Sequence, residues 1–300
     1  MKKALKWTGI GLAGLILIVV IAAGALYLRG GSRLNRRYEI PVAAIPIPAG
    51  ASAVARGRHL AEAVTMCHGC HGENLGGDTL IDQPTIVTLY ASNLTSGRGG
   101  VAAGYTDADY VRAIRHGVDP AGRGLMIMHS DAFSRLGVKD LGALIAYLKS
   151  LPPVDNVVPR TRGGPVGKVL VALGVFDRGP APLIPAEVID HAAHIPVAPV
   201  AGVTPEYGAY LVSVALCTMC HGTDLRGGPA MDEGAPAAPN IAVYAIPGGW
   251  TEEQFLSAIR TGVTPSGKSL DADSMPWEHY AKMTDDELKA IWRYLASLGL

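Results

Sequence analysis

Aromatic side chains, charged side chains and cysteine are all scarce in this sequence. Its 300 residues include only three Phe and four Cys, the charged fraction is 17%, and the formal net charge is zero. A chain without a basic excess is a poor candidate for a nucleic-acid partner. Few Phe together with 37 Gly indicate small, loop-rich domains in which a large cofactor supplies part of the core. The apolar content of 49% is still enough to form hydrophobic cores, and the length is typical of about two domains.

The charges that are present are unevenly distributed along the chain. Residues 1–40 carry seven Lys/Arg and one Asp/Glu, residues 41–155 carry nine and ten, and residues 156–300 carry ten and fifteen. The C-terminal part is therefore acidic, which favours a basic docking partner and again argues against nucleic acid. A modest acidic excess is equally well explained by solubility alone.

The four cysteines fall into two C-x-x-C-H stretches, Cys67-His68-Gly69-Cys70-His71 and Cys217-Thr218-Met219-Cys220-His221. This spacing is the attachment signature of a c-type haem. Residues at i, i+3 and i+4 share one face of a helical turn, so two thiols can form thioethers with haem vinyl groups while the histidine faces the iron. No cysteine remains for a disulfide or a cysteine-ligated cluster. We therefore expect two covalently bound haem c groups.

Two other kinds of site also use C-x-x-C. A zinc site or a thioredoxin-like redox pair would need the same two cysteines. The two pairs lie about 150 residues apart and each is followed by a histidine, which disfavours both alternatives.

The N-terminus contains a long apolar run. An uncharged stretch from Trp7 to Leu28 follows three lysines, and about twenty such residues span a bilayer as a helix. Trp7 and Tyr27 lie at its ends, where amphipathic aromatics gather at membrane interfaces. We expect residues 7–28 to form a retained single-pass anchor. The alternative is a cleaved signal peptide, because Ala23-Gly24-Ala25 resembles an A-x-A cleavage site, although the run is longer than a typical signal-peptide core.

The two halves of the chain repeat each other well beyond the cysteine motifs. The matched stretches are Gly72-Glu73-Asn74-Leu75 with Gly222-Thr223-Asp224-Leu225, residues 113–118 with 258–263, and residues 141–151 with 288–298. Thr106 and Thr251 each begin a middle helix with acidic residues in its first turn. Thr284-Asp285-Asp286-Glu287 reads as a capping box before the last helix.

These repeated residues resemble a tandem pair of class I cytochrome c domains, over roughly residues 50–155 and 203–300. In particular, the chain resembles the membrane-bound cytochrome subunits that serve alcohol, sugar and aldehyde dehydrogenases in bacteria. Those proteins often carry three haems, whereas this chain has motifs for two. The resemblance implies haem domains on the outer, periplasmic side of the bacterial cytoplasmic (inner) membrane, with the N-terminus inside.

The expected fold is all-α, with weak strand signals. Each unit should have a first helix, at about 53–69 and 204–219, and a last helix, at 138–150 and 284–297. The expected domain organisation is an anchor and juxtamembrane segment (1–40), a first cytochrome domain (41–155), a proline-rich linker (156–202) and a second cytochrome domain (203–300). The linker is too long for an ordinary connection, so we expect it to wrap a haem domain or to contact the membrane or a partner.

Each haem of this kind needs a second axial ligand opposite the histidine, and a methionine thioether raises the reduction potential relative to a second histidine. Met275-Pro276-Trp277 lies 54 residues after His221 and resembles the family's Met-Pro ligand loop. Aligning the last helices places Met128 opposite Met275, 57 residues after His71. Met126 and His129 are alternatives for the first haem. The expected iron ligands are therefore His71 with Met128 and His221 with Met275.

Some other polar residues allow more than one interpretation. Arg115 and Arg260 occupy matching positions and could pair with haem propionates, although solvated helix charges are the commoner explanation. His68 occupies the variable gap of its motif, where we expect an exposed side chain.

The expected function is single-electron transfer outside the cytoplasmic membrane, and not catalysis. The donor would be a dehydrogenase subunit or soluble carrier, and the acceptor an oxidase, a quinone pool or another cytochrome. Two alternatives stay open: a di-haem peroxidase, which needs an open or weakly ligated iron, and an assembly subunit that holds a dehydrogenase on the membrane.

Overall fold

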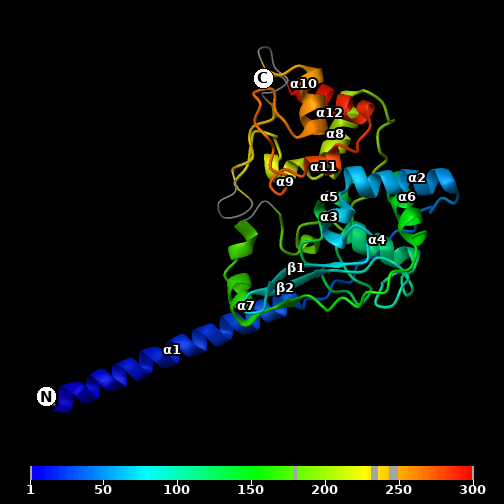
Figure 1. Ribbon diagram of the computed structural model, residues 1–300. Helices are drawn as coiled ribbons and strands as arrows, with labels where there is room; N and C mark the ends of the chain where they lie inside the picture. The colour runs from blue at the N-terminus through cyan, green and yellow to red at the C-terminus, as the bar shows by residue number, and fades with distance from the viewer. Residues whose placement is uncertain (1, 179–180, 231–235, 243–248, 299–300) are drawn as a thin grey trace.

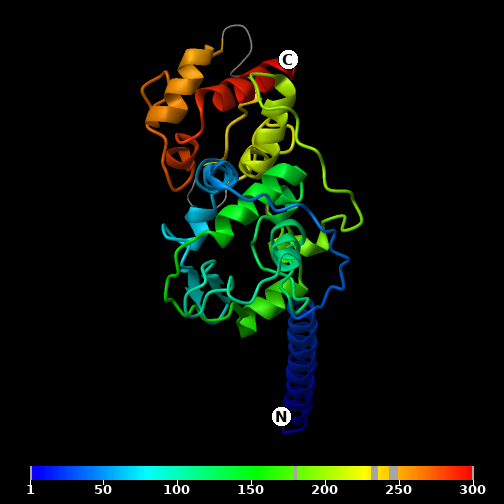
Figure 2. The same ribbon diagram turned by 90° about the vertical axis from the view of Figure 1, so that its right-hand side faces the viewer.

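A long helix, α1 (Lys2–Leu34), projects away from the rest of the molecule in both ribbon views (Figures 1 and 2). Its span Leu5–Leu34 is long and apolar enough to cross a membrane, and the most apolar part of that span is not buried inside the protein. Side chains such as Ile18 and Ile21 are more than 60% exposed. Such an exposed apolar helix suggests the membrane anchor expected over residues 7–28.

The computed structural model describes residues 2–178, 181–230, 236–242 and 249–298. The first half after α1 contains α2 (Ala51–His59), the π-helical turn η1 (Leu60–Val64), α3 (Cys67–His71), β1 (Asp78–Gln83), β2 (Val87–Ala91), α4 (Asp107–His116), α5 (Ser130–Phe133) and α6 (Val138–Lys149). The connecting segment contains β3 (Arg162–Gly163), α7 (Pro165–Ala172), η2 (Val175–Arg178) and η3 (Pro185–Glu187). The second half contains α8 (Pro205–Val214), α9 (Cys217–His221), α10 (Glu252–Thr261), α11 (Trp277–Tyr280) and α12 (Asp285–Ser297).

Three helices begin with capping boxes, at the positions where the sequence predicts helix starts. The side chains of Thr106, Thr251 and Thr284 each accept a hydrogen bond from the backbone N–H of the residue three positions later. The side chain of that later residue accepts a hydrogen bond from the threonine backbone N–H in return. These reciprocal bonds satisfy donors that a helix start would otherwise leave unpaired. The predicted starts of the middle helices and of the second unit's last helix are therefore confirmed.

In each half the first helix packs across the last helix through a glycine. A Cβ placed on Gly57 of α2 would lie 2.0 Å from the Ala143 carbonyl oxygen of α6, and one on Gly208 of α8 would lie 2.0 Å from that of Ala290 in α12. Only a residue without a side chain lets the two backbones approach this closely. The two glycines therefore mark structurally equivalent positions in the repeat.

The first helix of each half ends earlier than predicted. Directly before the first motif cysteine the chain adopts a left-handed conformation, with φ of 52° at Met66 and 62° at Leu216. A helix cannot continue through such a residue, so the cysteine motifs form separate helices, α3 and α9. The predictions of one helix over 53–69 and one over 204–219 were therefore wrong in this respect.

The first half also carries one residue more than the second between the packing glycine and the motif. Cys67 follows Gly57 by ten residues, whereas Cys217 follows Gly208 by nine. The extra residue is absorbed by the π-turn η1, in which the Thr65 N–H donates to the Leu60 carbonyl oxygen at 2.7 Å.

The all-α expectation needs a correction. The structure is rich in helices, but β1, β2 and β3 form a three-stranded antiparallel sheet in that order. The sequence of β2, Val-Thr-Leu-Tyr-Ala, suits a strand, and Leu89 and Ala91 are buried. Its second partner, β3, comes from about 70 residues further along the chain, so no local pattern reveals the sheet.

The connecting segment packs on the rest of the molecule, as its length indicates. Strand β3 pairs with β2, and α7 packs against the C-terminal end of α1. Arg33 of α1 forms ion pairs with Asp177 and Glu187, both at 2.6 Å. The end of α1 is thereby fixed to the connecting segment.

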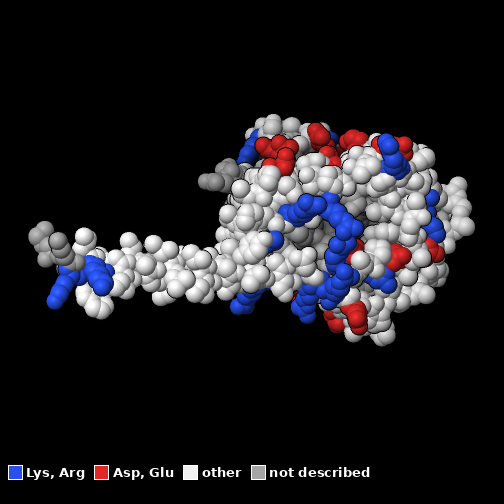
Figure 3. Space-filling view, turned by 90° about the horizontal axis from the view of Figure 1, so that it is seen from below, with Lys and Arg blue, Asp and Glu red and all other residues white. Residues whose placement is uncertain are grey.

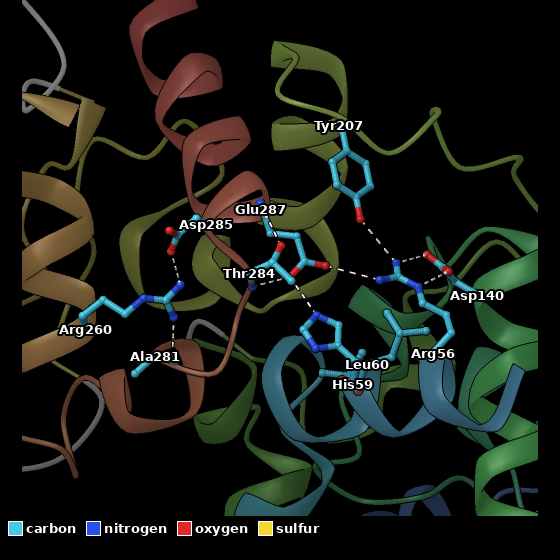
Figure 4. Close-up of polar contacts among 11 residues, drawn as sticks. Arg56, His59, Leu60, Asp140, Tyr207, Arg260, Ala281, Thr284, Asp285 and Glu287 are labelled. Carbon is cyan, nitrogen blue, oxygen red and sulfur yellow. Dashed lines mark hydrogen bonds and ion pairs between the residues drawn. The ribbon is translucent and has the colours of Figure 1, made fainter. Parts of the chain in front are cut away.

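The two halves meet through reciprocal polar contacts, and Figure 4 shows those of His59 and Arg56. His59 Nε2 lies 2.7 Å from a Glu287 carboxylate oxygen, and the Tyr210 hydroxyl donates to Asp140 at 2.7 Å. His59 and Tyr210 each lie two residues after the packing glycine, and Asp140 and Glu287 are the matching acids of the last helices. Each half therefore contributes one residue two positions after its packing glycine and one acid from its last helix, as in an interface with two-fold symmetry.

Arg56 bridges the two carboxylates at this interface. It contacts Asp140 at 3.0 Å and Glu287 at 3.2 Å, and also donates to the Tyr207 hydroxyl. Apolar side chains from both halves belong to a single core cluster around these groups. The two halves thus form one continuous packed body.

Candidate functional site

The two cysteine motifs form five-residue helices that place Cys, Cys and His on one side. His71 and His221 are only 9% and 7% exposed. Their Nδ1 atoms lie 2.8 Å from the carbonyl oxygens of Ser92 and Pro239. Because a carbonyl can only accept, each Nδ1 carries the proton and each Nε2 keeps a free lone pair. Burial lowers the pKa of both imidazoles, which favours the neutral form that binds metal.

None of the four cysteines forms a disulfide. Burial raises the pKa of Cys67 to about 11 and that of Cys217 to about 12. A redox-active C-x-x-C pair instead needs a lowered pKa. Within the described residues, no three His, Cys, Asp or Glu side chains converge into a metal site. The structure therefore favours neither the thioredoxin-like nor the zinc interpretation.

Met128 and Met275 occupy equivalent places in the two halves. The Met128 carbonyl oxygen accepts a hydrogen bond from the Ser130 N–H at 2.5 Å, and the Met275 carbonyl oxygen accepts one from the Trp277 N–H at 2.6 Å. Each methionine precedes a four-residue helix. Both side chains pack on the core cluster that also contacts Cys67 and Cys217.

The other two candidates near Met128 are placed differently. Met126 packs on a separate cluster formed by Val118, Val171, Leu183, Ile184 and Ala186. Ile127, between the two methionines, has φ of 57°, which turns the chain between them. His129 is half-buried at the N-cap of α5, and burial lowers its pKa. Of the two methionines, Met128 is the one that packs on the same core cluster as the cysteine motif.

The buried indole of Trp277 supplies a test of whether a haem fits. Its Nε1–H has no hydrogen-bond partner in the described part of the chain, although it is shielded from solvent. The ring packs so closely on Gly262 that a Cβ there would lie 2.3 Å from it. A buried N–H without an acceptor is costly. A haem propionate would supply the acceptor, so the residues present fit a haem c next to Met275.

The structure gives contacts for two arginines and one histidine that the sequence did not predict. The Arg115 and Arg260 guanidinium groups donate to the backbone carbonyls of Ser134 and Ala281, and Arg115, at 3% exposure, is not a solvated helix charge. His68 is half-buried, not exposed, and its Nδ1 lies 2.9 Å from the Glu73 carbonyl oxygen. The two arginine contacts join segments about 20 residues apart, which the sequence pattern does not bring together.

Two stretches of the chain, residues 54–152 and 205–299, each match the model of the cytochrome c family. The chain therefore belongs to the cytochrome c family. Cytochrome c domains imply covalently bound haem c, and the two matches together with two C-x-x-C-H motifs indicate two groups.

Curated proteins with similar sequences carry related descriptions. The chain is 28% identical over 277 residues to the fructose dehydrogenase cytochrome subunit of Gluconobacter japonicus, with 84% of this chain and 54% of that protein covered. It is 27% identical over 315 residues to the cytochrome c subunit of alcohol dehydrogenase (quinone) of Gluconacetobacter polyoxogenes, with 93% and 61% covered. The corresponding protein of Komagataeibacter europaeus matches with the same identity and coverage. The chain thus spans little more than half the length of these relatives.

Proposed function

We propose that this protein is a membrane-anchored di-haem cytochrome c. It carries single electrons from a periplasmic dehydrogenase, or another donor on that side, to a respiratory acceptor such as an oxidase or a further cytochrome. The observation that carries the proposal is the doubled family match, with one C-x-x-C-H motif in each copy. Similarity to cytochrome subunits of fructose and alcohol dehydrogenases supports a dehydrogenase as the donor.

The proposed ligand set follows from the placement of the side chains. Cys67 and Cys70 would bind one haem and Cys217 and Cys220 the other, with His71 and His221 as the first axial ligands. Met128 and Met275 would be the second axial ligands. Their equivalent backbone contacts and their shared core with the cysteine motifs support this assignment.

The protein's own groups prepare each site for this cofactor. A bound haem supplies an iron that alternates between two oxidation states. The carbonyls of Ser92 and Pro239 hold His71 and His221 in the tautomer that leaves Nε2 unprotonated. Burial of both imidazoles excludes water from the ligand atoms, and the Trp277 N–H is available to hold a propionate in place.

Membrane anchoring by α1 is part of the proposal, with the N-terminus in the cytoplasm. The exposed apolar stretch over residues 7–28 supports the anchor, with the exposed Arg29, Arg36 and Arg37 directly after it, where headgroups would lie. Basic residues flank both ends of this stretch, so the orientation is taken from the resemblance to proteins whose haem is attached on the outer side of the membrane. Figure 3 shows Lys and Arg side chains gathered on the lower face of the body and again at the far end of α1.

A potentiometric titration of the purified protein, followed optically, tests the ligand assignment. The weak far-red band of Met–Fe(III) bonding would be recorded for wild type, Met126→Ala, Met128→Ala, His129→Ala and Met275→Ala. We expect Met128→Ala and Met275→Ala each to lose about half of the band and to lower one of two potentials. Met126→Ala and His129→Ala should resemble wild type. An unchanged band in Met128→Ala would refute its assignment.

The peroxidase alternative rests on one specific observation, the half-buried His129 in the place of Pro276. A peroxidase needs an iron that peroxide can reach. Adding peroxide to the half-reduced protein separates the two functions: an electron carrier turns over little peroxide, whereas rapid turnover together with a high-spin haem in wild type would favour the enzyme.

A further inference from the structure

Arg115 and Arg260 make the same unusual contact in the two halves. Each lies in the last turn of the middle helix, α4 or α10, two residues before the glycine that ends it. Each guanidinium reaches across to the residue that ends the short helix after the proposed methionine ligand. Arg115 Nη1 donates to the Ser134 carbonyl of α5, and Arg260 Nη1 donates to the Ala281 carbonyl of α11 (Figure 4).

A cation is well suited to this position. The last carbonyls of a helix have no partner within it, and a nearby Arg both bonds them and complements the negative end of the helix dipole. A planar guanidinium can also bond a second acceptor at the same time, which a lysine ammonium does less precisely.

The second set of bonds ties each short helix to a further part of the chain, which differs between the two halves. Arg260 Nη2 donates to Asp285 Oδ1 at 2.7 Å, in the first turn of α12. Arg115 Nη2 donates to the carbonyls of Ala193 at 2.7 Å and His194 at 3.2 Å, in the connecting segment. Arg115 is only 3% exposed, so these bonds are shielded from water.

The clamped helices are directly continuous with the methionine loops. The Met128 and Met275 carbonyls accept from Ser130 and Trp277, the first residues of α5 and α11. Only a single residue therefore separates each methionine from a helix whose far end is held by the arginine.

We propose that Arg115 and Arg260 are positioning residues that hold Met128 and Met275 at their irons, each for its own haem. Loss of either arginine loosens one methionine and lowers one reduction potential, because a Met/His pair raises the potential. The inference rests on the proposed function, in which these methionines are axial ligands.

The test uses the full-length holoprotein and the variants Arg260→Gln, Arg260→Lys, Arg115→Gln and Arg293→Gln. Arg293 is the matched control: it lies in the same half as Arg260, is 55% exposed, and pairs with Glu252 on the surface. The readouts are the far-red band, the two potentials, and the rate at which added imidazole displaces methionine from the oxidised protein.

Arg260→Gln is expected to accelerate imidazole binding at one haem by about tenfold, the factor expected from losing a charge-assisted hydrogen bond. It should also lower one of the two potentials. Arg115→Gln should do the same at the other haem, Arg260→Lys should fall between Gln and wild type, and Arg293→Gln should match wild type.

Two outcomes would overturn the positioning role. In the first, Arg260→Gln keeps the far-red band, the two potentials and the imidazole rate of wild type, although Met275→Ala loses half of the band. The other is an equal change in both haems, which would show a general loss of stability. An unchanged band in Met275→Ala would instead refute the ligand assignment itself. If Arg260→Gln fails to fold, Arg260→Lys decides, because a positioning role predicts an intermediate rate of imidazole binding.

Discussion

Gly208 lies so close to Ala290 that a Cβ on the glycine would be 2.0 Å from the alanine carbonyl oxygen. Gly57 and Ala143 have the same relationship in the first half. In both halves the helix that leads toward the cysteine motif is thus seated directly on the backbone of the last helix. The position of each motif depends on this contact.

Gly208→Ala should therefore separate α8 from α12. The added methyl group forces a backbone shift, which typically costs about 1–3 kcal/mol. Urea unfolding should show this loss of free energy. Gly202→Ala is the control, since a Cβ there meets only Thr204 at 3.9 Å and should change the free energy of unfolding by less than about 0.5 kcal/mol. Equal effects of the two substitutions would contradict the steric explanation.

The acid stability of the protein should depend on Glu287. Burial alone would raise its pKa, but hydrogen bonds from His59 and the Thr284 N–H, with the charge of Arg56, lower it to about 2. The ordinary value is 4.5. A carboxyl whose pKa is lowered in the folded state stabilises the protein above its unfolded pKa. That contribution is lost as the pH falls through the folded value.

We therefore expect the free energy of unfolding to fall between about pH 5 and pH 2, with Glu287 contributing up to about 3 kcal/mol. Glu287→Gln should remove that part of the pH dependence and lower stability at pH 7. Glu278→Gln, which replaces an exposed acid in the same half, should retain the wild-type profile. A wild-type pH profile in Glu287→Gln would rule out this role for the carboxylate.

Arg56 should couple the unfolding of the two halves. It bridges Asp140 and Glu287, and its removal leaves two buried carboxylates with fewer partners. Calorimetry of wild type should show one cooperative transition for the two halves, and Arg56→Leu should lower its midpoint and broaden or split it. Arg58→Leu, two residues away and exposed, should leave a single transition. Two separate transitions in wild type would show that the contact does not couple the halves.

Covalent haem content should respond to each motif separately. Wild type should contain two haems per chain, and the double substitution Cys217→Ala with Cys220→Ala should contain one. Thr218→Ala, within the same motif, should keep two because it removes neither thiol. A pyridine haemochrome assay measures this ratio directly. Two haems in the double cysteine variant would contradict attachment at the second motif.

The sequence was informative where the signal is local. The capping boxes at Thr106, Thr251 and Thr284 could be predicted because each lies within four consecutive residues. The repeat also identified matching helices and equivalent methionine positions. The left-handed residues Met66 and Leu216 could not be foreseen, since neither residue type favours that conformation.

Contacts between distant segments were the main omission. Strand β3 pairs with β2 across about 70 residues, and Arg115 bonds carbonyls in the connecting segment. The extra residue of η1 lies between Gly57 and the first cysteine motif, and only the packing of Gly57 and Gly208 shows that these glycines are equivalent. Such relationships are set by packing and not by any periodicity in the sequence.

The ion pairs of Arg33 have a consequence for how the molecule would meet a partner. Because Arg33 of α1 is paired with Asp177 and Glu187 and the helix packs against α7, α1 is rigidly attached to the body and is not a flexible linker. If α1 crosses the bilayer as proposed, the body stands at a fixed height and tilt above the lipid surface. The protein could then diffuse laterally but could not reach upward, so a membrane-bound partner must present its redox centre at that same height.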